Sequence, residues 1–445
     1  MTLTETVKNA GIIGAGGAGF PTHVKLASKP EFIIVNGAEC EPLLMVDREI
    51  CLRHADELLQ ALELVRSELG AAHAYYALKE KYREAVDALE KNIAKYPAVS
   101  IHLLPNIYPA GDEQVLVYEV TKRIVPEGGI PLAVGCVVLN VETLFNIYRA
   151  VYENAPVTDK YVTITGAVRT PMTLKVPVGT VVSELLGYCG VTEPDFKVID
   201  GGPMMGKIVE DTGAPVTKTT KGLIVLPSSH PRIAAKERPL SSMMHMARSA
   251  CCHCSECTEV CPRALLGHSI HPDKMMRIAS YNKVCDATSS VTETFLCCEC
   301  GLCEIACVMN LQPWKLHHEL KGKLIASGIK NPHKNAPEAA HPFREYRRFP
   351  ESKLVARLGL SKYEVEAPLK EDHDFRPARV ILNLKQSAGA PAIPQVSVGD
   401  QVGKGDLVGE IPEKALGSRL HASVTGKVVS VDEKSICIET LQEEK

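Results

Sequence analysis

The sequence predicts a multidomain α/β protein with a Rossmann-like N-terminal domain, a small α+β module, a helical cysteine-rich domain and a C-terminal all-β module. Three observations predict this fold class. Apolar runs alternate with amphipathic stretches over residues 1–155, a pattern typical of α/β domains. Eleven of the 16 cysteines lie between positions 251 and 307. Short strand-like runs separated by Gly and Asp turns fill residues 376–445.

Length and composition predict the number of domains and exclude one class of function. At about 150 residues per domain, a chain of 445 residues should hold about three or four domains. We place them at 1–155, 156–230, 231–330 and 376–445, with a linker over 331–375. The net charge of −3 and the 5% content of aromatic residues offer neither a basic surface nor stacking platforms. We therefore expect no nucleic-acid partner.

The sequence indicates a cytoplasmic protein. No window of about 20 apolar residues is present, so we expect no membrane span. The first residues, MTLTETVKNAGIIG, lack the basic region and the cleavage site of a secretory signal. In a reducing cytoplasm, cysteines are more often metal ligands than disulfide partners.

The elements of the first two domains follow from the spacing of apolar residues. EFIIVNG (31–37) and PLAVGCVVLN (131–140) are expected as buried strands, and 49–69 and 81–95 as amphipathic helices. Residues 161–190 begin with the alternating run VTITGAV and end with the helical run VVSELLGYCG, which predicts a small α+β module. Further strands are expected over 198–226, around the glycine-rich turn GGPMMG.

After residue 230 the sequence pattern changes from helical to irregular and then to short strands. From about 240 to 330 the pattern is helical and rich in cysteine. Residues 327–375 combine prolines with many charges and predict irregular structure, in which REYRR (344–348) is a solvated face. The strand-like runs after residue 376 predict a compact β module.

The cysteines form two runs with the same spacing, C-x2-C-x2-C-x3-C. The first run comprises Cys251, Cys254, Cys257 and Cys261, and Pro262 follows it. The second run, which starts 36 residues after Cys261, comprises Cys297, Cys300, Cys303 and Cys307. This is the arrangement of ferredoxins with two [4Fe–4S] clusters.

In that arrangement the fourth cysteine of each run binds the other cluster. One cluster would take Cys251, Cys254, Cys257 and Cys307. The other would take Cys297, Cys300, Cys303 and Cys261. Two zinc sites are the alternative, but zinc favours CxxC pairs separated by a longer loop. Val308 stands where a proline often follows the second run, which removes no ligand.

The other cysteines are given structural roles. Cys252 and Cys298 sit beside the first ligands of the two runs and are expected to be spectators. Cys285 lies between the runs, and His253 is expected on the surface. Five scattered cysteines are expected to be small buried apolar residues: Cys40, Cys51, Cys136, Cys189 and Cys437.

A glycine-rich segment near the N-terminus, GIIGAGGAGFPT (11–22), suits the approach of a phosphate to the backbone. Gly14, Gly16 and Gly19 have the G-x-G-x-x-G spacing of dinucleotide-binding loops. However, Pro21 follows at once and no long strand precedes the loop. On spacing alone, a phosphate site and a structural turn both remain open.

Four blocks in order resemble the flavin domain of the NADH-oxidising subunit of respiratory complex I, and still more the C subunit of Rnf electron-transport complexes. They are GAGGAGFPT with Lys25, VNGAECEP (35–42), YPAGDEQ (108–114) and LNVETL (139–144). Residues 161–190 resemble the ubiquitin-like (SLBB) module that follows the flavin domain in both families. DGGPMMG (200–206) resembles a further segment of the Rnf subunit.

This resemblance implies an FMN site and an NADH site. The residues implied to hold FMN are Gly14, Gly16, Gly17, Gly19, Lys25, Asn36, Glu39, Gly111, Asp112, Asn140 and Thr143. Among them, Lys25 would pair with the phosphate of FMN. The residues implied to face the nicotinamide nucleotide are Phe20, Glu41 and Glu113. Ala15 replaces an arginine and Ala38 an acidic residue of the complex I pattern, which affects nucleotide binding more than flavin binding.

The C-terminal module resembles a barrel-sandwich hybrid, the fold of lipoyl and biotinyl domains. Its segments are GAPAIPQVSVGDQVGKGDLVGEI and LHASVTGKVVSV. Lys427 lies at a strand start rather than at a hairpin tip, so a structural or docking role is expected instead of a swinging arm. Rnf C subunits carry this module before the flavin domain. Its position at the end resembles the cobalamin reductases of propanediol-utilisation microcompartments.

The resemblance implies an NADH-dependent oxidoreductase that passes electrons through FMN and two [4Fe–4S] clusters, reducing cob(III)alamin or cob(II)alamin to cob(I)alamin. We assign no catalytic acid–base residues, because the cofactors carry this chemistry. Implied partners are cobalamin or a cobalamin-handling enzyme and a shell protein, inside a bacterial microcompartment. The alternatives are an Rnf-like subunit that reduces a protein, and a flavin-free electron carrier or docking module.

Overall fold

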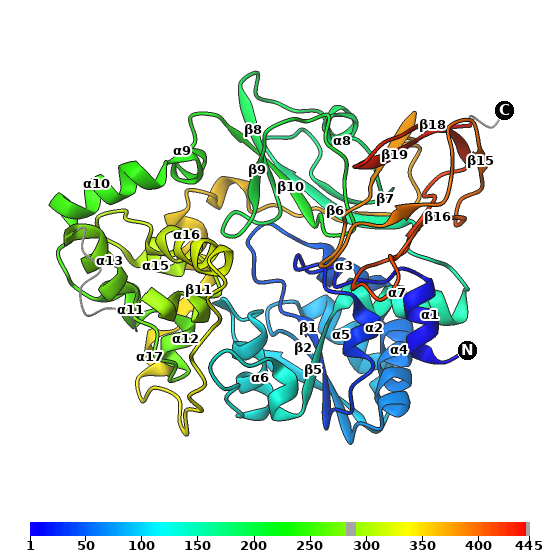
Figure 1. Ribbon diagram of the computed structural model, residues 1–445. Coiled ribbons are helices and arrows are strands. Elements are labelled where there is room, and N and C mark those ends of the chain that lie inside the picture. The colour runs from blue at the N-terminus through cyan, green and yellow to red at the C-terminus, as the bar shows by residue number, and fades with distance from the viewer. Residues whose placement is uncertain (282–290, 442–445) are drawn as a thin grey trace.

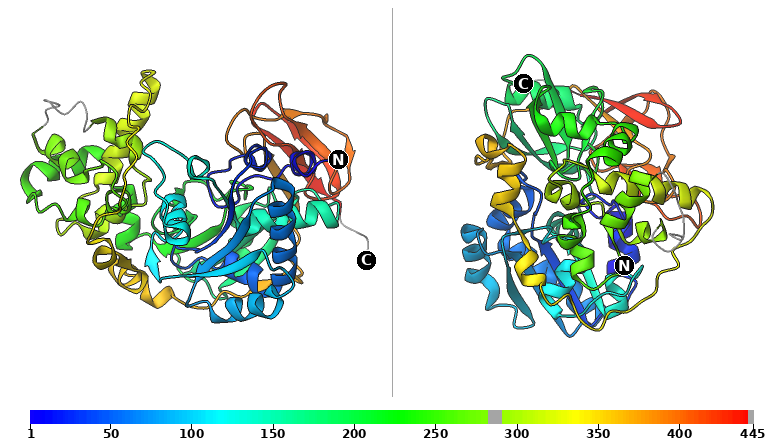
Figure 2. Two further views of the ribbon diagram at one scale, coloured as in Figure 1. Left: turned by 90° about the horizontal axis from the view of Figure 1, so that it is seen from below. Right: turned by 90° about the vertical axis from the view of Figure 1, so that its left-hand side faces the viewer.

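The structure is a computed structural model that describes residues 1–281 and 291–441. Figure 1 shows the parallel sheet of the N-terminal unit below a second sheet, with the cysteine-rich helices at the left and the C-terminal strands at the right. Figure 2 shows, from below, that these last two units lie at opposite ends of the molecule. The N-terminal unit therefore lies between them.

A four-stranded parallel sheet with strand order β3-β2-β1-β5 forms the centre of the N-terminal unit. Its strands are β1 (Phe32–Gly37), β2 (His73–Lys79), β3 (Val99–Leu104) and β5 (Cys136–Asn140). In β1, Ile33 and Val35 enter one apolar core and Ile34 enters another. Successive side chains of a strand point to opposite faces, so both faces of this sheet are buried. The predicted α/β fold is confirmed.

Helices cover both faces of this sheet. They are α1 (Leu3–Asn9), α2 (Thr22–Lys25), α3 (Val46–Arg53), α4 (Ala55–Leu69), α5 (Arg83–Ile93), α6 (Glu113–Thr121) and α7 (Val141–Tyr152). Helices α3, α4, α5 and α7 contribute to the core on the Ile33 side, and α6 contributes to the core on the Ile34 side. The loops at the carboxyl ends of β1 and β5 are thereby held between two packed layers.

Two elements differ from the sequence-based prediction. The helix expected over 49–69 is two helices, because His54 (φ −125°, ψ 37°) breaks the run between α3 and α4. The strand expected over 131–140 begins only at Cys136. Pro131–Val134 instead forms a 3₁₀ turn (η1), which Gly135 ends with a left-handed φ of +75°.

A six-stranded mixed sheet with strand order β12-β7-β6-β10-β8-β9 forms the second unit. Its strands are β6 (Asp159–Gly166), β7 (Met172–Pro177), β8 (Phe196–Asp200), β9 (Lys207–Val209), β10 (Gly222–Pro227) and β12 (Leu369–Lys370), with helix α8 (Val182–Cys189). The expected α+β module is present.

The segment expected as a linker contains short elements that pair with other units. They are α17 (Arg344–Arg347), β11 (Phe349–Pro350), α18 (Glu351–Arg357), η3 (Ser361–Tyr363) and β12. Strand β11 pairs with β4 (Ile107–Tyr108) of the N-terminal unit, and β12 pairs with β7. This stretch therefore runs along the other units, forms a separate two-stranded sheet with β4 and extends the sheet of the second unit by one strand.

The cysteine-rich unit consists of helices in the part of the chain that is described. They are α9 (Pro231–Glu237), α10 (Leu240–Ala250), α11 (Glu256–Glu259), α12 (Pro262–Leu265), α13 (Pro272–Tyr281), η2 (Glu293–Leu296), α15 (Leu302–Ala306) and α16 (Pro313–Ala326). Met243, Met275 and Met276 pack with Leu316 in its core. The helices beside the cysteine runs are short, so the runs lie largely in loops.

Two small antiparallel sheets form the C-terminal unit, with strand orders β13-β19-β18-β15 and β14-β16-β17. The strands are β13 (Arg379–Asn383), β14 (Ile393–Pro394), β15 (Gln401–Val402), β16 (Leu407–Glu410), β17 (Leu420–His421), β18 (Gly426–Val431) and β19 (Ser435–Thr440). Val380, Val408, Val428 and Ile436 fill the core between them. Within residues 1–281 and 291–441, no helix has the length and apolar character needed to cross a membrane.

Candidate functional site

Residues 14–19 form a tight loop at the edge of the N-terminal unit. The Gly14 N–H donates to the Phe20 carbonyl (2.8 Å), and the Gly19 N–H donates to the Gly14 carbonyl (3.2 Å). Gly17 and Gly19 have φ of +115° and +61°, which L-residues with a side chain rarely adopt. A single bridge between Ile13 and Pro21 precedes the four-residue helix α2, in place of the long strand of a dinucleotide fold.

The N-terminus of α7 holds this loop from one side. The Asn140 side chain caps the helix by accepting the N–H groups of Glu142 (3.0 Å) and Thr143 (3.4 Å). The Thr143 hydroxyl accepts the Ala15 N–H (2.9 Å) and donates to the Ile13 carbonyl (3.2 Å). Three predicted site elements, the glycine loop, Asn140 and Thr143, therefore lie together.

Lys25 is the last residue of α2, and its side chain reaches the start of α6. Its amine donates to the Glu113 carboxylate (2.9 Å) and to the Val138 carbonyl of β5 (3.1 Å). The side chain is 30% exposed, so a ligand can reach this cation. The contact joins one residue predicted for the FMN phosphate to one predicted for the nicotinamide nucleotide.

Asn36 and Gly111 meet at the carboxyl end of β1. The Asn36 amide donates to the Gly111 carbonyl (2.9 Å), and its oxygen accepts the Ala38 N–H (3.3 Å). A Cβ added at Gly111 would lie 3.1 Å from the Cys40 sulfur and 3.4 Å from the Asn36 side-chain oxygen. The space beside Asn36 is therefore too tight for a larger residue at position 111 unless Cys40 moves.

Asp112 joins the N-terminal unit to the cysteine-rich unit. One carboxylate oxygen caps α6 by accepting the N–H groups of Gln114 and Val115, both at 3.1 Å. The other accepts the Arg263 guanidinium at 2.7 Å. Burial alone would lower the pKa of Arg263, but Asp112 and then Cys298 outweigh it and raise that pKa. Arg263 thus lies between a predicted flavin residue and the second cysteine run.

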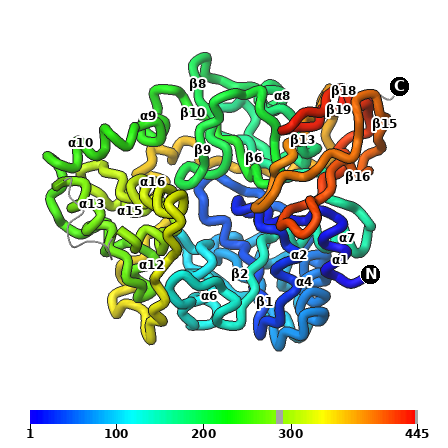
Figure 3. Tube along the Cα trace, viewed as in Figure 1, coloured from blue at the N-terminus to red at the C-terminus, as the bar shows by residue number. Residues whose placement is uncertain are grey.

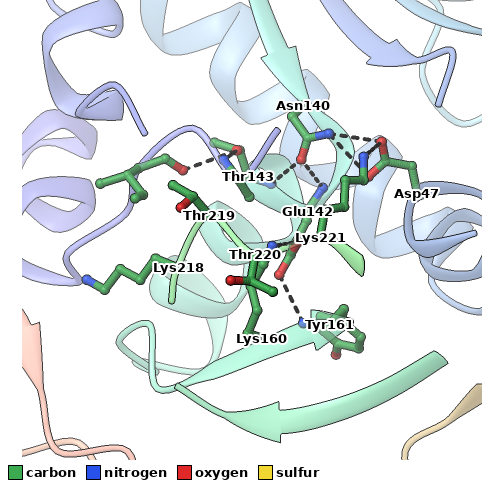
Figure 4. A network of polar contacts seen from close by, with 12 residues as sticks. Asp47, Asn140, Glu142, Thr143, Lys160, Tyr161, Lys218, Thr219, Thr220 and Lys221 are labelled. Atoms are coloured by element: carbon green, nitrogen blue, oxygen red, sulfur yellow. Dashed lines mark hydrogen bonds and ion pairs between the residues drawn. The ribbon is translucent and has the colours of Figure 1, made fainter. Parts of the chain in front are cut away.

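Glu39 turns toward α3, where it accepts the N–H groups of Asp47 (2.9 Å) and Arg48 (3.2 Å). Asp47 in turn accepts the Asn140 amide at 3.0 Å and pairs with Lys221 (Figure 4). Burial raises the pKa of Glu39 to about 7, and Lys221 limits the rise. Glu39 therefore fixes the loop after β1 and the start of α3.

Glu41 is engaged by the glycine-rich turn of the second unit. Its carboxylate accepts the N–H groups of Met204 (2.9 Å) and Met205 (2.8 Å). Burial raises its pKa, while the two amides oppose that shift. Of the residues predicted to face the nicotinamide nucleotide, Glu41 binds this turn, Glu113 binds Lys25, and the Phe20 carbonyl closes the glycine loop.

The C-terminal unit packs against the glycine loop (Figure 3). The Ala388 N–H donates to the Gly19 carbonyl at 2.9 Å. Lys218 is buried beside this contact, and its amine donates to the carbonyls of Gly11 (2.8 Å) and Arg419 (2.7 Å). Burial lowers the pKa of Lys218 to about 7, because these acceptors carry no charge.

The two cysteine runs share one backbone conformation. In the first run, His253 and Ser255 have φ of +55° and +63°. At the matching positions of the second run, Glu299 and Gly301 have φ of +60° and +78°. Left-handed residues at these positions curl the backbone around a centre, as nests of N–H groups do around iron–sulfur clusters. The sequence repeat is therefore also a structural repeat.

The predicted ligands meet across the two runs. Burial, then Asp273 and the thiols of Cys307 and Cys254, raise the pKa of Cys257 to about 12. Burial and the thiols of Cys297, Cys257 and Cys261 raise the pKa of Cys303. Cys307 is thus beside the first run and Cys261 beside the second. Among the described residues, no three His, Cys, Asp or Glu side chains converge as around one ion, whereas a [4Fe–4S] cluster takes each cysteine on a different iron.

The neighbouring cysteines and His253 are placed as follows. Cys252 is exposed, whereas Cys298 lies beside Cys300 and Arg263. His253 is exposed, and its ring stacks on Tyr281 with the centroids 6.1 Å apart. Cys285 lies outside the described residues. The Tyr108 hydroxyl donates to the Cys300 carbonyl at 2.6 Å, which ties the 108–114 loop to the second run.

Sequence reasoning missed several polar residues around the site: Asp47, Arg263, Lys218 and Lys221. Asp47 and Lys221 pair although 174 residues separate them, so no local motif could have joined them. Burial opposes the charge of Lys221, but Asp47 and Glu39 outweigh burial and raise its pKa. Arg263 could have been predicted from the sequence, because it directly follows Pro262 at the end of the first cysteine run.

Models of four known domain families match the chain. Residues 7–149 match the Nuo51 FMN-binding domain, and residues 161–207 match the SLBB domain. Residues 250–312 match a 4Fe-4S dicluster domain, and residues 367–442 match the RnfC barrel sandwich hybrid domain. The chain therefore combines an FMN-binding domain with a domain for two [4Fe–4S] clusters, as the sequence predicts.

Curated relatives match the chain along most of its length. The cobalamin reductase PduS of Salmonella typhimurium is 40% identical over 98% of this chain and 96% of the relative. The protein of the same name from Citrobacter freundii is also 40% identical, with the same coverage. A protein of the Na⁺-translocating ferredoxin:NAD⁺ oxidoreductase complex of Acetobacterium woodii, its C subunit, is 35% identical over 58% of this chain and 57% of its own length. The chain therefore belongs to the cobalamin reductase PduS family.

Proposed function

We propose that this chain is an NADH-dependent reductase that passes electrons through FMN and two [4Fe–4S] clusters to cobalamin, giving cob(I)alamin. The observation that carries the proposal is the direct contact between the predicted flavin pocket and the cysteine-rich unit. Tyr108 donates to the Cys300 carbonyl (2.6 Å), and Arg263 donates to Asp112 (2.7 Å). The relatives named cobalamin reductase PduS support cobalamin as the acceptor.

The residues of the N-terminal unit fit FMN. Asn36 and Asn140 lie at the carboxyl ends of the parallel strands β1 and β5, and ligands of open α/β sheets bind outside such ends. A Cβ at Gly17 would meet no described atom within 4 Å, so the loop backbone is accessible there. When bound, FMN accepts a hydride and releases its electrons one at a time. In this proposal the glycine amides and Lys25 hold its phosphate, and Asn36, Gly111, Asp112, Asn140 and Thr143 hold its ring and ribityl chain.

The remaining predicted residues shape the pocket from its edge. Glu39 fixes the loop after β1 through its bonds to α3, and Glu41 fixes the 201–206 turn. Because Glu41 is bound by two backbone amides, we propose that it positions this turn beside the nucleotide instead of binding the nucleotide itself. Phe20 and Glu113 stay as the proposed contacts of NADH.

The cysteine-rich unit fits two [4Fe–4S] clusters bound by crossed ligand sets. The repeated left-handed positions and the proximity of Cys307 to Cys257 and of Cys261 to Cys297 support this assignment. The cluster of Cys297, Cys300, Cys303 and Cys261 would lie nearer the flavin, since Tyr108 binds Cys300 and the Asp112 partner Arg263 lies beside Cys298. The cluster of Cys251, Cys254, Cys257 and Cys307 would then pass electrons onward.

We further propose that the protein works inside a bacterial microcompartment, next to a shell protein or a cobalamin-handling enzyme. The position of the barrel-sandwich module at the end of the chain, which resembles the cobalamin reductases of propanediol-utilisation microcompartments, supports this setting. Purified microcompartments should contain the protein in a protease-protected form. Recovery only in the fraction outside the shell would contradict this location.

The test of the proposed function is the anaerobic visible spectrum of the reconstituted protein before and after NADH, with flavin and iron counted. We expect one FMN and about eight irons per chain, as two [4Fe–4S] clusters require. NADH should bleach the absorbance of the flavin and of the clusters together. Added cob(II)alamin should then restore the oxidised spectrum as cob(I)alamin appears. Iron without FMN and no response to NADH would leave an electron carrier. Bleaching without transfer to cobalamin would point to a protein acceptor.

A further inference from the structure

A cavity of about 530 Å³ lies on the side of the second cysteine run that faces α9 and α18. Its lining includes Arg232, Arg238, Glu304, Cys307, Val308 and Arg357. The volume is within the range of small-molecule sites, about 300–1,000 Å³. Cys307 is a proposed cluster ligand, and the other proposed ligands do not line this cavity in the described structure. The cavity is therefore separate from the space that the cluster itself would fill.

The cavity wall carries positive charge that nearby carboxylates do not balance. Arg238 donates to the Asn310 carbonyl (2.7 Å), and Arg357 donates to the Ile305 carbonyl (2.5 Å). Both acceptors are neutral, and neither arginine has a carboxylate partner among residues 1–281 and 291–441. Each guanidinium has five N–H donors, so most of them stay available to a ligand.

The third arginine is part of the wall rather than a free donor. Arg232 is buried, donates to Glu304 at 2.7 Å and also binds the Pro203 carbonyl. Glu304 accepts the Trp314 indole N–H (2.7 Å) as well, so this carboxylate is fully engaged. Because Glu304 is engaged, the guanidinium groups of Arg238 and Arg357 leave the cavity wall positive, which favours an anion.

The position of the cavity suits electron exit. Cys307 lines it, and Cys307 belongs to the proposed cluster that lies farther from the flavin. The next residue, Val308, is 65% exposed, so an apolar rim lies beside the arginines. A ligand in this cavity would contact a thiolate ligand of the cluster, and no long path would separate donor and acceptor.

We propose that this cavity binds the electron acceptor, and that Arg238 and Arg357 recognise the phosphodiester of a corrinoid's nucleotide loop. The proposal rests on the proposed function. The corrin ring would lie toward the rim at Val308 and Cys307. The reaction balances as NADH + 2 cob(II)alamin → NAD⁺ + H⁺ + 2 cob(I)alamin, with each cobalt gaining one electron.

The test compares cobalamin with cobinamide, a corrinoid that lacks the nucleotide loop and its phosphate. The variants are R238Q, R357Q and the double variant in the full chain with FMN and clusters. R376Q is the matched control, because Arg376 is exposed and also donates to backbone carbonyls. For the double variant we expect the KM for cob(II)alamin to rise about tenfold or more, the loss expected for charge-assisted hydrogen bonds. The KM for cobinamide should stay the same.

Two further readouts separate binding from folding and from the earlier steps. Equilibrium dialysis of cobalamin against the oxidised protein should show the same loss of affinity without turnover. In the arginine variants, the FMN content, the iron content and the rate of ferricyanide reduction by NADH should match those of the natural chain. An equal KM rise for both corrinoids, or no change for either, would overturn the phosphate site. If the natural chain reduces ferricyanide with NADH but reduces neither corrinoid, the proposed function itself fails.

Discussion

Gly16 lies in the glycine loop beside Asn140, and its φ is not in the left-handed region. A Cβ added there would lie 3.6 Å from the Asn140 Cβ, an ordinary contact distance. We therefore expect Gly16→Ala to fold normally but to lower FMN affinity at least about tenfold, about 1.4 kcal/mol, because the methyl group keeps the phosphate from the backbone. Titration of the apoprotein with FMN measures this.

The control for this variant is Gly187→Ala in α8, where an added Cβ meets no described atom within 4 Å. It should leave FMN affinity unchanged and should not lower the melting temperature, because alanine favours a helix over glycine. Equal FMN affinity in the two alanine variants would place the phosphate elsewhere.

Lys218 gives a prediction about pH at the same scale. Burial lowers its pKa to about 7 in the folded chain, whereas a free lysine titrates near about 10.4. Between these values the unfolded chain holds a proton that the folded chain lacks, so the free energy of unfolding rises with pH. Below about pH 7 both states are protonated and the contribution is constant.

Lys218→Met should therefore flatten the rise in apparent melting temperature from about pH 7 to about pH 10. The variant should also be less stable overall, since the Gly11 and Arg419 carbonyls lose a donor. Differential scanning fluorimetry across this pH range measures both effects. Parallel curves for the variant and the natural chain would show that Lys218 titrates as an exposed lysine.

At the scale of elements, the Asp112–Arg263 pair joins the start of α6 to α12. Both side chains are largely buried, so removing one partner leaves an unpaired charge that costs about 3–5 kcal/mol. We expect Arg263→Met to lower stability by this order and to slow the NADH-driven bleaching of the clusters, because the 108–114 loop keeps only its Tyr108 contact with the cysteine-rich unit. Stopped-flow spectroscopy separates flavin reduction from cluster reduction.

The double variant Asp112→Asn with Arg263→Met should regain part of the lost stability, since no charge is left unpaired. Dithionite should reduce the clusters equally in all variants. If NADH bleaches the clusters of the Arg263→Met variant at the normal rate, the Asp112–Arg263 pair has no part in electron transfer.

The elements also show what sequence could and could not predict. Within the run 31–37, Phe32–Gly37 is a strand buried on both faces, and the continuous apolar character of the run predicted it correctly. The break of the 49–69 helix at His54 was missed, because the causes are distant: its ring stacks on Phe145 (4.4 Å) and binds Glu371. In the candidate site, by contrast, the glycine loop, Asn140 and Thr143 could be predicted from local motifs. The Asp47–Lys221 pair beside them has no local signal.

At the scale of the whole molecule, the cysteine-rich unit and the C-terminal unit both contact the N-terminal unit, which lies between them. The cysteine-rich unit contacts it through Tyr108 and Asp112, and the C-terminal unit contacts it through Ala388 and Gly19. Module order along the chain predicted neither contact, because position in sequence does not determine position in space. The C-terminal unit is packed on the glycine loop, which supports the expected structural role over that of a mobile arm.

This arrangement predicts that the two crossing cysteines have different effects on electron flow. Cys261 lies beside the second run, which contacts the N-terminal unit. Cys307 lies beside the first run and lines the proposed acceptor cavity. In Cys261→Ala, NADH should reduce the flavin while the remaining cluster stays oxidised. In Cys307→Ala, NADH should reduce both the flavin and the cluster nearer to it, but transfer to cob(II)alamin should fall at least about a hundredfold, about 2.7 kcal/mol in barrier. Low-temperature electron paramagnetic resonance of NADH-treated samples distinguishes the two. Identical spectra for both variants would mean that the clusters do not act in series, and the exit site would then have to lie elsewhere than beside Cys307.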